Sequence, residues 1–419
     1  MTDILDELQW RGLIAQTTDE TALRKALDDG PVTLYCGFDP TAPSLHFGNL
    51  VQLIVLRHLQ RAGHRVICLV GGSTGLIGDP RPTAERVLKT KEQTAEWVGR
   101  IQGQVRPFLD FEGDNAAFTV NNLDWTSPMS ALDFLRDVGK HFRVNQMVRK
   151  DAVAARLNSD EGISYTEFSY QILQGLDFLQ LFREYGCTLQ TGGQDQWGNL
   201  TAGSDLIHRA EGESVHLLTT PLITDAAGNK FGKSEGNAVW LDPAMTSPYA
   251  FYQYWLNVED ASVIKLLKVF TDRSAQEIGE LERVVADEPF RRAAQKVLAT
   301  DMTRLVHGEE ATVSVEAASQ ALFGKGDLGS LDERTLIDAT SELPGADVPA
   351  GTGVLDALVA TGLVDSKKAA RRAIGDGSVS VNGEKIADEA RVLSPADYFH
   401  GRVAVLRRGR KNLAAARAS

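Results

Sequence analysis

The chain has 419 residues, of which 43% are hydrophobic and 24% charged, a globular composition that excludes a disordered or fibrous protein. This length exceeds one ordinary hydrophobic core, so we expect two or three domains. The net charge of −12 argues against nonspecific binding to nucleic acid.

Three features of the chain bear on its compartment. The first residues lack the basic and apolar regions of a secretory signal. The longest apolar runs, such as residues 51–56, are far shorter than the roughly 20 residues that a membrane span needs. Three cysteines without a Cys-x-x-Cys pair exclude a disulfide scaffold and a cysteine-rich zinc site. We therefore expect a cytoplasmic protein with no membrane contact.

Two apolar runs near the start, residues 31–37 (PVTLYCG) and 65–70 (RVICLV), flank a stretch with helical periodicity, residues 48–62. Such a β-α-β unit predicts a parallel sheet with helices on its faces. Ligands of these sheets bind at the carboxyl ends of the strands, so chemistry is expected after Gly37, after Val70 and in further loops that follow strands.

Two short motifs carry groups that suit a triphosphate. His46 and Gly48 (HFGN) precede the predicted helix, whose first N–H groups bind phosphate well, and His46 can donate a hydrogen bond to it. Lys230, Lys233 and Ser234 (KFGKS) lie in a loop that can close over phosphates and offset their charge. Taken singly, a capping or core histidine and a solvated basic turn are the plainer interpretations.

Two glycine-rich segments follow predicted strands. Residues 71–80 (GGSTGLIGDP) contain four glycines, which predicts tight backbone packing around a ligand, and Asp79 is a candidate partner for an ammonium group. A merely tight turn is the alternative. Residues 190–199 (QTGGQDQWGN) are polar and are predicted as a second such loop.

Residues 167–182 predict a helix with two distinct faces. Tyr170, Gln174 and Asp177 share one face at positions i, i+4 and i+7, and an apolar stripe through Leu176 lies opposite them. A polar stripe of this kind can line a cleft for a polar, partly aromatic ligand. An ordinary surface helix explains it equally well.

The second half of the chain changes in character. Residues 246–324 predict helices, with Ser247 capping one before Pro248 and Ser274 opening a capping box. Residues 344–353 (PGADVPAGTG) predict a linker.

The last part of the chain is basic. Residues 353–419 hold 12 Lys and Arg against 7 Asp and Glu, a net +5, whereas the rest holds 32 against 49, a net −17. A basic tail on an acidic body suits a selective RNA partner, although a chance excess of surface cations also explains it. Within the tail, Ser366 is predicted to cap a basic helix, and Asn382 with Gly383 predicts a hairpin turn.

The order and spacing of these motifs resemble those of bacterial tyrosyl-tRNA synthetases, which are class I aminoacyl-tRNA synthetases. The resemblance extends over about residues 5–412. HFGN resembles the family's HIGH motif, and residues 230–234 resemble its KMSKS loop. Residues 138–142, 192–199 and 246–252 are also similar to the family.

The resemblance implies that the chain uses ATP to convert L-tyrosine into tyrosyl-adenylate and pyrophosphate, then transfers tyrosine to the 3′-terminal adenosine of tRNA(Tyr). It implies ATP as a substrate, Mg²⁺ carried with ATP and no tightly bound protein metal. The positions that match the family's tyrosine pocket are Tyr35 and Asp177 at the phenol hydroxyl, Asp79, Tyr170 and Gln174 at the ammonium, and Gln196 near the carboxylate.

The resemblance also assigns the ATP side of the site. The positions that match the binding of ATP and the adenylate are Asp39, His46, Gly48, Asn49, Gly193, Asp195, Lys233 and Ser234. Those implied to stabilise the triphosphate during the reaction are His46, Lys230, Lys233 and Arg86.

The sequence departs from the family pattern at two places in the ATP-binding part of the site. Asn49 replaces the second histidine of HIGH, and it keeps a hydrogen bond but carries no charge. The loop after Asp79 is one residue shorter and lacks the family's lysine. Arg86 matches the family's arginine there, and whether Arg81 replaces the lysine stays open.

The expected architecture is α/β: a Rossmann-like parallel-sheet domain (1–225, with inserted helices), a KMSKS-like loop and α-helical anticodon-side domain (226–325), a linker (326–352) and a small α+β RNA-binding domain (353–419). The resemblance implies a homodimer. The residues implied to contact RNA phosphates are Lys367, Lys368, Arg371, Arg372, Arg407, Arg408 and Lys411.

Three alternatives remain at this point. A tryptophanyl-tRNA synthetase shares the catalytic fold, but Tyr35 and Asp177 suit a phenol better than an indole. A nonenzymatic RNA-binding protein on the same scaffold is a second alternative. Such a protein need not keep residues 230–234 and the tyrosine pocket, and this chain has both. An adenylyltransferase that acts without tRNA leaves the basic tail without a role.

Overall fold

A computed structural model of the chain describes residues 3–81, 84–224, 231–234, 237–324, 326–409 and 412–418. For residues 151, 233, 234 and 237 the description covers the backbone alone. The chain forms two compact units, Met1–Met245 with Glu259–Ala294, and Thr246–Val258 with Gln295–Ser419. Among the described residues, no helix has both the length and the apolar character that crossing a bilayer requires.

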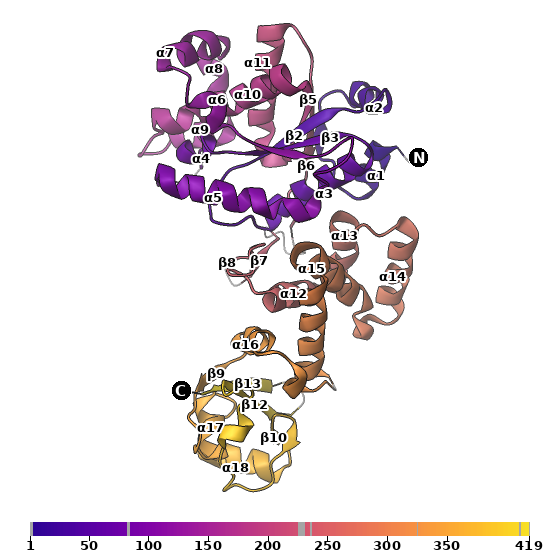
Figure 1. Ribbon diagram of the computed structural model, residues 1–419, viewed down its shortest axis with the longest axis vertical. Helices are drawn as coiled ribbons and strands as arrows, with labels where there is room; N and C mark the ends of the chain where they lie inside the picture. The colour runs from indigo at the N-terminus through magenta and orange to yellow at the C-terminus, as the bar shows by residue number, and fades with distance from the viewer. Residues whose placement is uncertain are drawn as a thin grey trace. The chain divides into compact units, whose positions relative to one another are not determined.

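The first unit is built on a six-stranded sheet (Figure 1). All strands are parallel except β1, which runs antiparallel to β6. Their order across the sheet is β1 (Gln16–Thr17), β6 (His216–Thr220), β5 (Cys187–Gly193), β2 (Thr33–Phe38), β3 (Arg65–Val70) and β4 (Phe118–Asn121). The predicted Rossmann-like parallel sheet is therefore confirmed.

The predicted β-α-β unit consists of β2, α3 (Phe47–Arg61) and β3. β3 is a continuous buried run from Val66 onward, as expected for a strand with both faces covered. β2 pairs in parallel with β3 on one side and β5 on the other, with Tyr35 opposite Ile67 and Gln190. The strand order changes direction between β2 and β5, which places a ligand crevice at their carboxyl ends.

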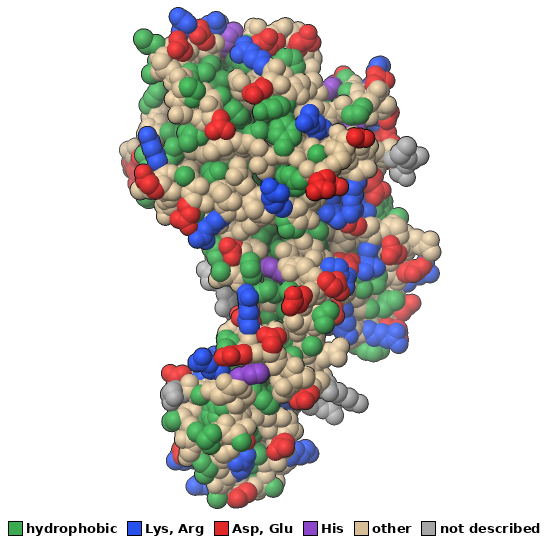
Figure 2. Space-filling model, in the orientation of Figure 1, with side chains coloured by type: hydrophobic (Ala, Val, Ile, Leu, Met, Phe, Trp, Pro, Cys, Tyr) green, Lys and Arg blue, Asp and Glu red, His purple; other side chains and the backbone are tan. Residues whose placement is uncertain are grey.

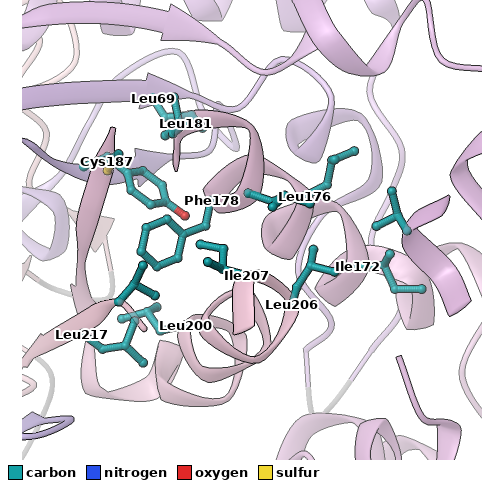
Figure 3. Packing of buried hydrophobic residues seen from close by; sticks show 14 of the residues in the cluster. Leu69, Ile172, Leu176, Phe178, Leu181, Cys187, Leu200, Leu206, Ile207 and Leu217 are labelled. Atoms are coloured by element: carbon teal, nitrogen blue, oxygen red, sulfur yellow. The ribbon is translucent and has the colours of Figure 1, made fainter. Parts of the chain in front are cut away.

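Two long helices, α10 (Tyr165–Tyr185) and α11 (Trp197–Glu211), pack against β5. Figure 3 shows Phe178 and Leu181 of α10 with Leu200 and Ile207 of α11 and Cys187 of β5 in one packed cluster. This cluster is the hydrophobic support beneath the crevice. It fixes the rotation of α10, and with it the direction of the polar stripe on that helix.

The predicted capping box at Ser274 is confirmed, because Ser274 accepts from the Glu277 N–H and Glu277 accepts from the Ser274 N–H. The other elements of the first unit are α1 (Ile4–Trp10), α2 (Glu20–Asp28), α4 (Thr74–Ile77), α5 (Lys91–Gln104), η1 (Arg106–Phe108), α6 (Leu123–Thr126), α7 (Ala131–Asp133), η2 (Phe134–Val138), η3 (Gly139–His141), α8 (Val144–Met147), α9 (Asp151–Leu157), η4 (Gln194–Gln196), β7 (Lys233–Ser234), β8 (Asn237–Ala238), α13 (Asp260–Phe270), α14 (Ala275–Asp287) and η5 (Pro289–Arg291).

The second unit combines helices with a five-stranded sheet ordered β11-β10-β12-β13-β9. Its elements are α12 (Pro248–Leu256), most of α15 (Ala293–Phe323), η6 (Leu328–Ser330), α16 (Glu333–Ser341), β9 (Gly345–Asp347), α17 (Val354–Ala360), α18 (Lys367–Gly375), β10 (Val379–Val381), β11 (Glu384–Lys385), η7 (Pro395–Asp397), β12 (Val403–Arg408) and β13 (Asn412–Arg417).

Three local predictions in the second unit are confirmed. Ser247 and Ser366 accept from the backbone as N-caps of α12 and α18. Asn382 and Gly383 have φ of 50° and 87°, the left-handed pair that a tight hairpin between β10 and β11 needs. The tail is thus the expected small α+β fold.

The structure differs from the predicted linker at residues 326–352. This segment contains α16 and β9, and β9 pairs in parallel with β13. A Cβ at Gly345 would lie 2.3 Å from the Ala415 carbonyl oxygen, so glycine is needed for this close pairing. The expected helical segment 226–325 is also shared between the two units. The positions of the domain boundaries stay a prediction.

Candidate active site

A cavity of about 660 Å³ opens at the carboxyl ends of β2 and β5. Thirteen of the predicted tyrosine, ATP and catalytic residues line it, and they come from segments far apart in the chain. They are Tyr35, Asp39, His46, Gly48, Asn49, Asp79, Arg86, Tyr170, Gln174, Asp177, Gly193, Asp195 and Gln196.

The lysine-bearing loop is only partly described. Lys230 lies outside the described residues, and Lys233 and Ser234 are described as the backbone of β7. Phe231 and Gly232, which directly precede them, line the cavity. A Cβ at Gly232 would lie 2.6 Å from the Phe47 Cβ, so this loop approaches the start of α3 closely.

Tyr35 and Asp177 form one end of the cavity, and both are nearly completely buried, at 1% and 2% exposure. Asn122 Nδ2 and Trp125 Nε1 donate to the two oxygens of Asp177, each at 2.9 Å. The Tyr35 hydroxyl has no hydrogen-bond partner among the described residues. Because a buried polar group is costly without a partner, the Tyr35 hydroxyl can form a hydrogen bond with a polar group of a ligand.

Burial dominates the acid–base properties of this end. It raises the pKa of Asp177 to about 8, although the hydrogen bonds from Asn122 and Trp125 favour the ionised form. Burial, and then the Asp177 charge, raise the pKa of Tyr35 well above its usual 10, so its hydroxyl keeps its proton.

A second network joins Asp39 to the same helix. Tyr170 donates to Asp39 Oδ2 at 2.7 Å, and Thr74 donates to Asp39 Oδ1 at 2.6 Å. Asn122 also donates to Thr74, at 2.9 Å, so it links the two networks. Burial raises the pKa of Asp39, against the lowering effect of the bonds from Thr74 and Tyr170.

The glycines of the segment 71–80 pack against the site's own side chains. A Cβ at Gly71 would lie 2.1 Å from Asp39 Oδ1, and one at Gly72 would lie 2.2 Å from Asn121 Oδ1. The packing is therefore tight, but it is against the protein's own side chains, and tight packing around a ligand stays a prediction. This close contact restricts the position of the Asp39 side chain, which belongs to the polar network.

His46 and Asn49 cap α3 reciprocally. The His46 Nδ1 accepts from the Gly48 N–H at 3.0 Å, and Asn49 Oδ1 accepts from the His46 N–H at 3.2 Å. With Nδ1 acting as an acceptor, we infer that the ring proton sits on Nε2, which makes Nε2 a donor. The capping interpretation and the phosphate-binding interpretation of His46 are thus compatible.

Asp79 belongs to a ring of hydrogen bonds. It accepts from Lys150 Nζ at 2.9 Å, from Gln196 Nε2 at 3.1 Å and from Asn199 Nδ2 at 3.2 Å. Asn199 in turn donates to Gln196 Oε1 at 2.8 Å and accepts from Lys150 at 2.7 Å. The predicted ammonium-binding carboxylate is therefore held by several groups before any ligand arrives.

Comparisons with known proteins agree over both units. A family model described as tRNA synthetases class I (W and Y) matches residues 27–324, and one described as tyrosine–tRNA ligase SYY-like C-terminal domain matches residues 336–415. The tyrosine–tRNA ligase of Streptomyces avermitilis is 62% identical over 416 residues, which cover 99% of each chain. The chain belongs to the class I tyrosine–tRNA ligase family.

Two further relatives of this ligase family support the assignment. The tyrosine–tRNA ligase of Leifsonia xyli is 61% identical over 413 residues, 98% of this chain and 93% of that one. A C-terminally truncated mitochondrial tyrosyl-tRNA synthetase of Coccidioides posadasii has a TM-score of 0.67 at 32% identity, covering 75% of this chain and 91% of that one. The chain is thus an aminoacyl-tRNA synthetase, and the tryptophanyl and nonenzymatic alternatives are set aside.

Several ligase residues in the site were not predicted. Asn122 and Trp125 orient Asp177, and Thr74 orients Asp39. Asn122 follows β4, so the rule that polar residues gather after parallel strands could have pointed to it. Nothing in the local sequence distinguishes Lys150.

The ligase's loop after Asp79 is anchored by a buried ion pair. Arg156 and Glu167 pair at 2.9 Å with side chains 2% and 1% exposed. Glu167 Oε1 accepts from the Arg86 N–H at 2.9 Å, and Arg86 Nε donates to the Asp79 carbonyl oxygen at 2.6 Å. Arg81 also lines the cavity.

Among the described residues, no group of three or more His, Cys, Asp or Glu is arranged to hold a metal ion.

Proposed function

We propose that this tyrosine–tRNA ligase recognises its substrate through Tyr35 and Asp177, activates it with ATP and transfers it to the 3′-terminal adenosine of tRNA(Tyr). The observation that carries this proposal is the buried Tyr35 hydroxyl, which lacks a partner among the described residues and interacts electrostatically with Asp177. A phenol hydroxyl can donate to Asp177 and accept from Tyr35. Phenylalanine or tryptophan would leave both groups without that partner, which penalises their binding.

In the proposed first step, a carboxylate oxygen of tyrosine attacks the α-phosphorus of ATP, and pyrophosphate leaves with the Mg²⁺ that ATP brought. No proton transfer and no protein nucleophile are needed, so the protein aligns the reactants and offsets phosphate charge. We assign the second task to His46 at the start of α3, to Arg86, and to Lys230 and Lys233. In the second step, a hydroxyl of the terminal adenosine attacks the tyrosyl carbonyl, its proton passes to the phosphate of the adenylate, and AMP leaves as the ester bond forms.

The polar residues of the cavity are proposed to form two groups, one for tyrosine and one for ATP. Asp79, Tyr170 and Gln174 are proposed to bind the substrate ammonium, with Gln196 close to its carboxylate. The remaining cavity residues, Asp39, Gly48, Asn49, Gly193 and Asp195, are proposed to bind ATP and the adenylate. Ser234, of the segment 230–234, is proposed to bind them as well.

ATP–pyrophosphate exchange with each amino acid in turn tests this proposal. We expect exchange with tyrosine and none with tryptophan or phenylalanine at equal concentration, because only tyrosine satisfies both buried polar groups. Exchange with tryptophan, or with no amino acid, would overturn the proposed substrate.

The tail is proposed to bind tRNA through α18. Lys367, Lys368, Arg371 and Arg372 are all exposed on this helix. Lys367 and Arg371 form ion pairs with Asp356 and Glu389, and such exposed pairs are weak enough to exchange for phosphate.

Two other cations of the tail, Arg407 and Arg408, differ in exposure, and a third lies outside the described residues. Arg408 is exposed, whereas Arg407 is partly buried and donates to the Leu322 carbonyl oxygen, so Arg407 fits the RNA prediction least. Lys411 lies outside the described residues. On the face drawn in Figure 2, the basic side chains of this unit are interspersed with acidic ones.

Replacing the four cations of α18 with glutamine is expected to weaken tRNA binding and leave tyrosine activation unchanged. The slope of log affinity against log salt should fall by roughly 0.7–0.9 for each phosphate contact that is lost. Filter binding of tRNA at several salt concentrations measures this slope. The control is the double variant Lys25→Gln plus Arg136→Gln, which removes two exposed cations of the first unit. These substitutions are cleaner than deleting residues 353–419, because a deletion would leave β9 without its partner β13. An unchanged salt slope would contradict the tail's role.

We also propose that the protein is a homodimer and that it is located in the cytoplasm. Large apolar side chains of the first unit are exposed within residues 132–165, namely Leu132, Leu135, Val144, Leu157 and Tyr165. A homodimer that covers this surface accounts for them, and a monomer in sedimentation equilibrium would contradict it. The three cysteines are free and buried, which suits the reducing cytoplasm.

A further inference from the structure

The carboxylate of Asp79 is almost fully committed to the protein. Lys150 Nζ and Asn199 Nδ2 donate to its Oδ1, at 2.9 and 3.2 Å, and Gln196 Nε2 donates to its Oδ2 at 3.1 Å. The ion pair with Lys150 is well shielded, with side chains 11% and 19% exposed for Lys150 and Asp79.

Lys150 reaches Asp79 from outside the substrate cavity. Asp79 and Gln196 line the cavity that holds the predicted tyrosine residues, whereas Lys150 lines a second cavity of about 350 Å³. Lys150 therefore bonds to Asp79 without lining the substrate cavity, whereas Tyr170 and Gln174, beside which the substrate's ammonium is expected, line that cavity.

A count of acceptor sites decides what remains for a ligand. A carboxylate has about four lone-pair sites, two on each oxygen. Two donors use Oδ1 and one uses Oδ2, so one site is left, on the oxygen that also contacts the cavity-lining Gln196. The groups bonded to Oδ1 thus turn Oδ2 toward the substrate.

The same lysine reaches the second recognition group indirectly. Lys150 donates to Asn199 Oδ1 at 2.7 Å, and Asn199 donates to Gln196 Oε1 at 2.8 Å. The bonds among Lys150, Asp79, Gln196 and Asn199 form a closed ring. Loss of its only cation frees the Asp79 carboxylate most directly, because Lys150 reaches Gln196 only through Asn199.

We propose that Lys150 is a positioning residue for amino-acid recognition, which fixes the Asp79 carboxylate from the outer side so that Oδ2 keeps one acceptor site for the substrate ammonium. This inference rests on the proposed tyrosine-binding function. The competing effect is repulsion between two cations that share one carboxylate. If repulsion dominated, removing Lys150 would tighten tyrosine binding, so the two effects have opposite signs.

The test compares Lys150→Met with the full-length wild type in ATP–pyrophosphate exchange. We expect the KM for tyrosine to rise about tenfold, with the KM for ATP and kcat changed by less than about twofold, because the phosphate side of the site is untouched. Arg149→Met is the matched control. Among the described residues, Arg149 lines the same second cavity and shares no hydrogen bond with Asp79, so the KM for tyrosine should stay unchanged.

Two tyrosine analogues separate positioning from general damage. Tyramine keeps the ammonium group, whereas 3-(4-hydroxyphenyl)propionate lacks it. As competitive inhibitors, tyramine should bind about tenfold more weakly to Lys150→Met, and the propionate should bind with less than about threefold change. Equal weakening of both analogues, or an unchanged or lower KM for tyrosine, would overturn the positioning role. Absence of tyrosine exchange in the wild type would instead overturn the proposed function.

Discussion

Asp177→Asn is expected to lower kcat/KM for tyrosine activation by about 10²–10³-fold, because truncating one partner of a buried charged hydrogen bond costs about 2–5 kcal/mol. The geometry of the pocket increases the effect. Asp177 accepts from both Asn122 and Trp125, so the amide group of asparagine would place its own N–H against one of these donors. ATP–pyrophosphate exchange with tyrosine and with phenylalanine measures the change.

The ratio of kcat/KM for tyrosine to kcat/KM for phenylalanine distinguishes a role in recognition from a general loss of activity. The phenylalanine concentration is raised until the wild type gives a measurable exchange rate. Phenylalanine has no hydroxyl, so its rate should fall less than that of tyrosine, and the preference for tyrosine should shrink. Glu184→Gln removes a carboxylate from an exposed position of the same helix, and it should leave the preference intact. A preference that survives in Asp177→Asn would remove Asp177 from the recognition site.

The same carboxyl group predicts how tyrosine binding depends on pH. Burial raises the pKa of Asp177 to about 8, so below that pH part of the empty enzyme carries the protonated acid. A phenol that donates its hydrogen bond binds the ionised form, and the dissociation constant should therefore fall as pH rises from 6 to 8. Equilibrium dialysis measures this trend, which should be absent in Asp177→Asn.

His46→Asn is expected to reduce kcat for pyrophosphate exchange by about 10²–10³-fold, the usual effect of removing one donor to developing charge. Asparagine is a good N-cap, so α3 should keep its start and the midpoint of thermal unfolding should change little. The imidazole Nε2, which we infer to carry the proton, has no counterpart in the shorter side chain. The KM for tyrosine should be unchanged, because the phenol end of the cavity is separate.

His46→Ala distinguishes the two roles of this histidine. It removes the cap as well as the donor, so it should lose the same activity and about 1 kcal/mol of stability in addition. Chemical denaturation of both variants measures the difference. Full activity in His46→Asn would show that capping is the whole role of His46.

Local patterns in the chain predict much of this fold. The apolar runs and helical periodicity of residues 31–70 predict β2, α3 and β3, and short side chains such as Ser274 and Ser366 mark where helices begin. These features depend on interactions between residues a few positions apart, which a sequence displays directly. The segment 326–352, predicted as a linker, contains α16 and β9. Glycine and proline are common in linkers, but glycine also permits close pairing of strands, so composition does not separate the two cases.

The candidate site was predicted in part, through the family resemblance. That resemblance named the residues that are expected to face the ligand, such as Tyr35, Asp177 and Asp79, and the structure brings them to one cavity. It did not name the side chains that hold them. The signal for those residues is weak because each one is an ordinary polar or basic residue in its local context.

What the sequence alone determined was the β2-α3-β3 unit, the helical character of residues 167–182 and 246–324, and the caps and turns, while the family resemblance supplied the residues that suit tyrosine and ATP. Tertiary structure alone decided which groups orient these residues. Asn122 donates a hydrogen bond to Asp177, 55 positions away in the sequence, and Lys150 donates one to Asp79, 71 positions away. Such contacts arise because the parallel sheet and the packing of α10 bring distant segments together, and no local periodicity records which donor will meet which acceptor.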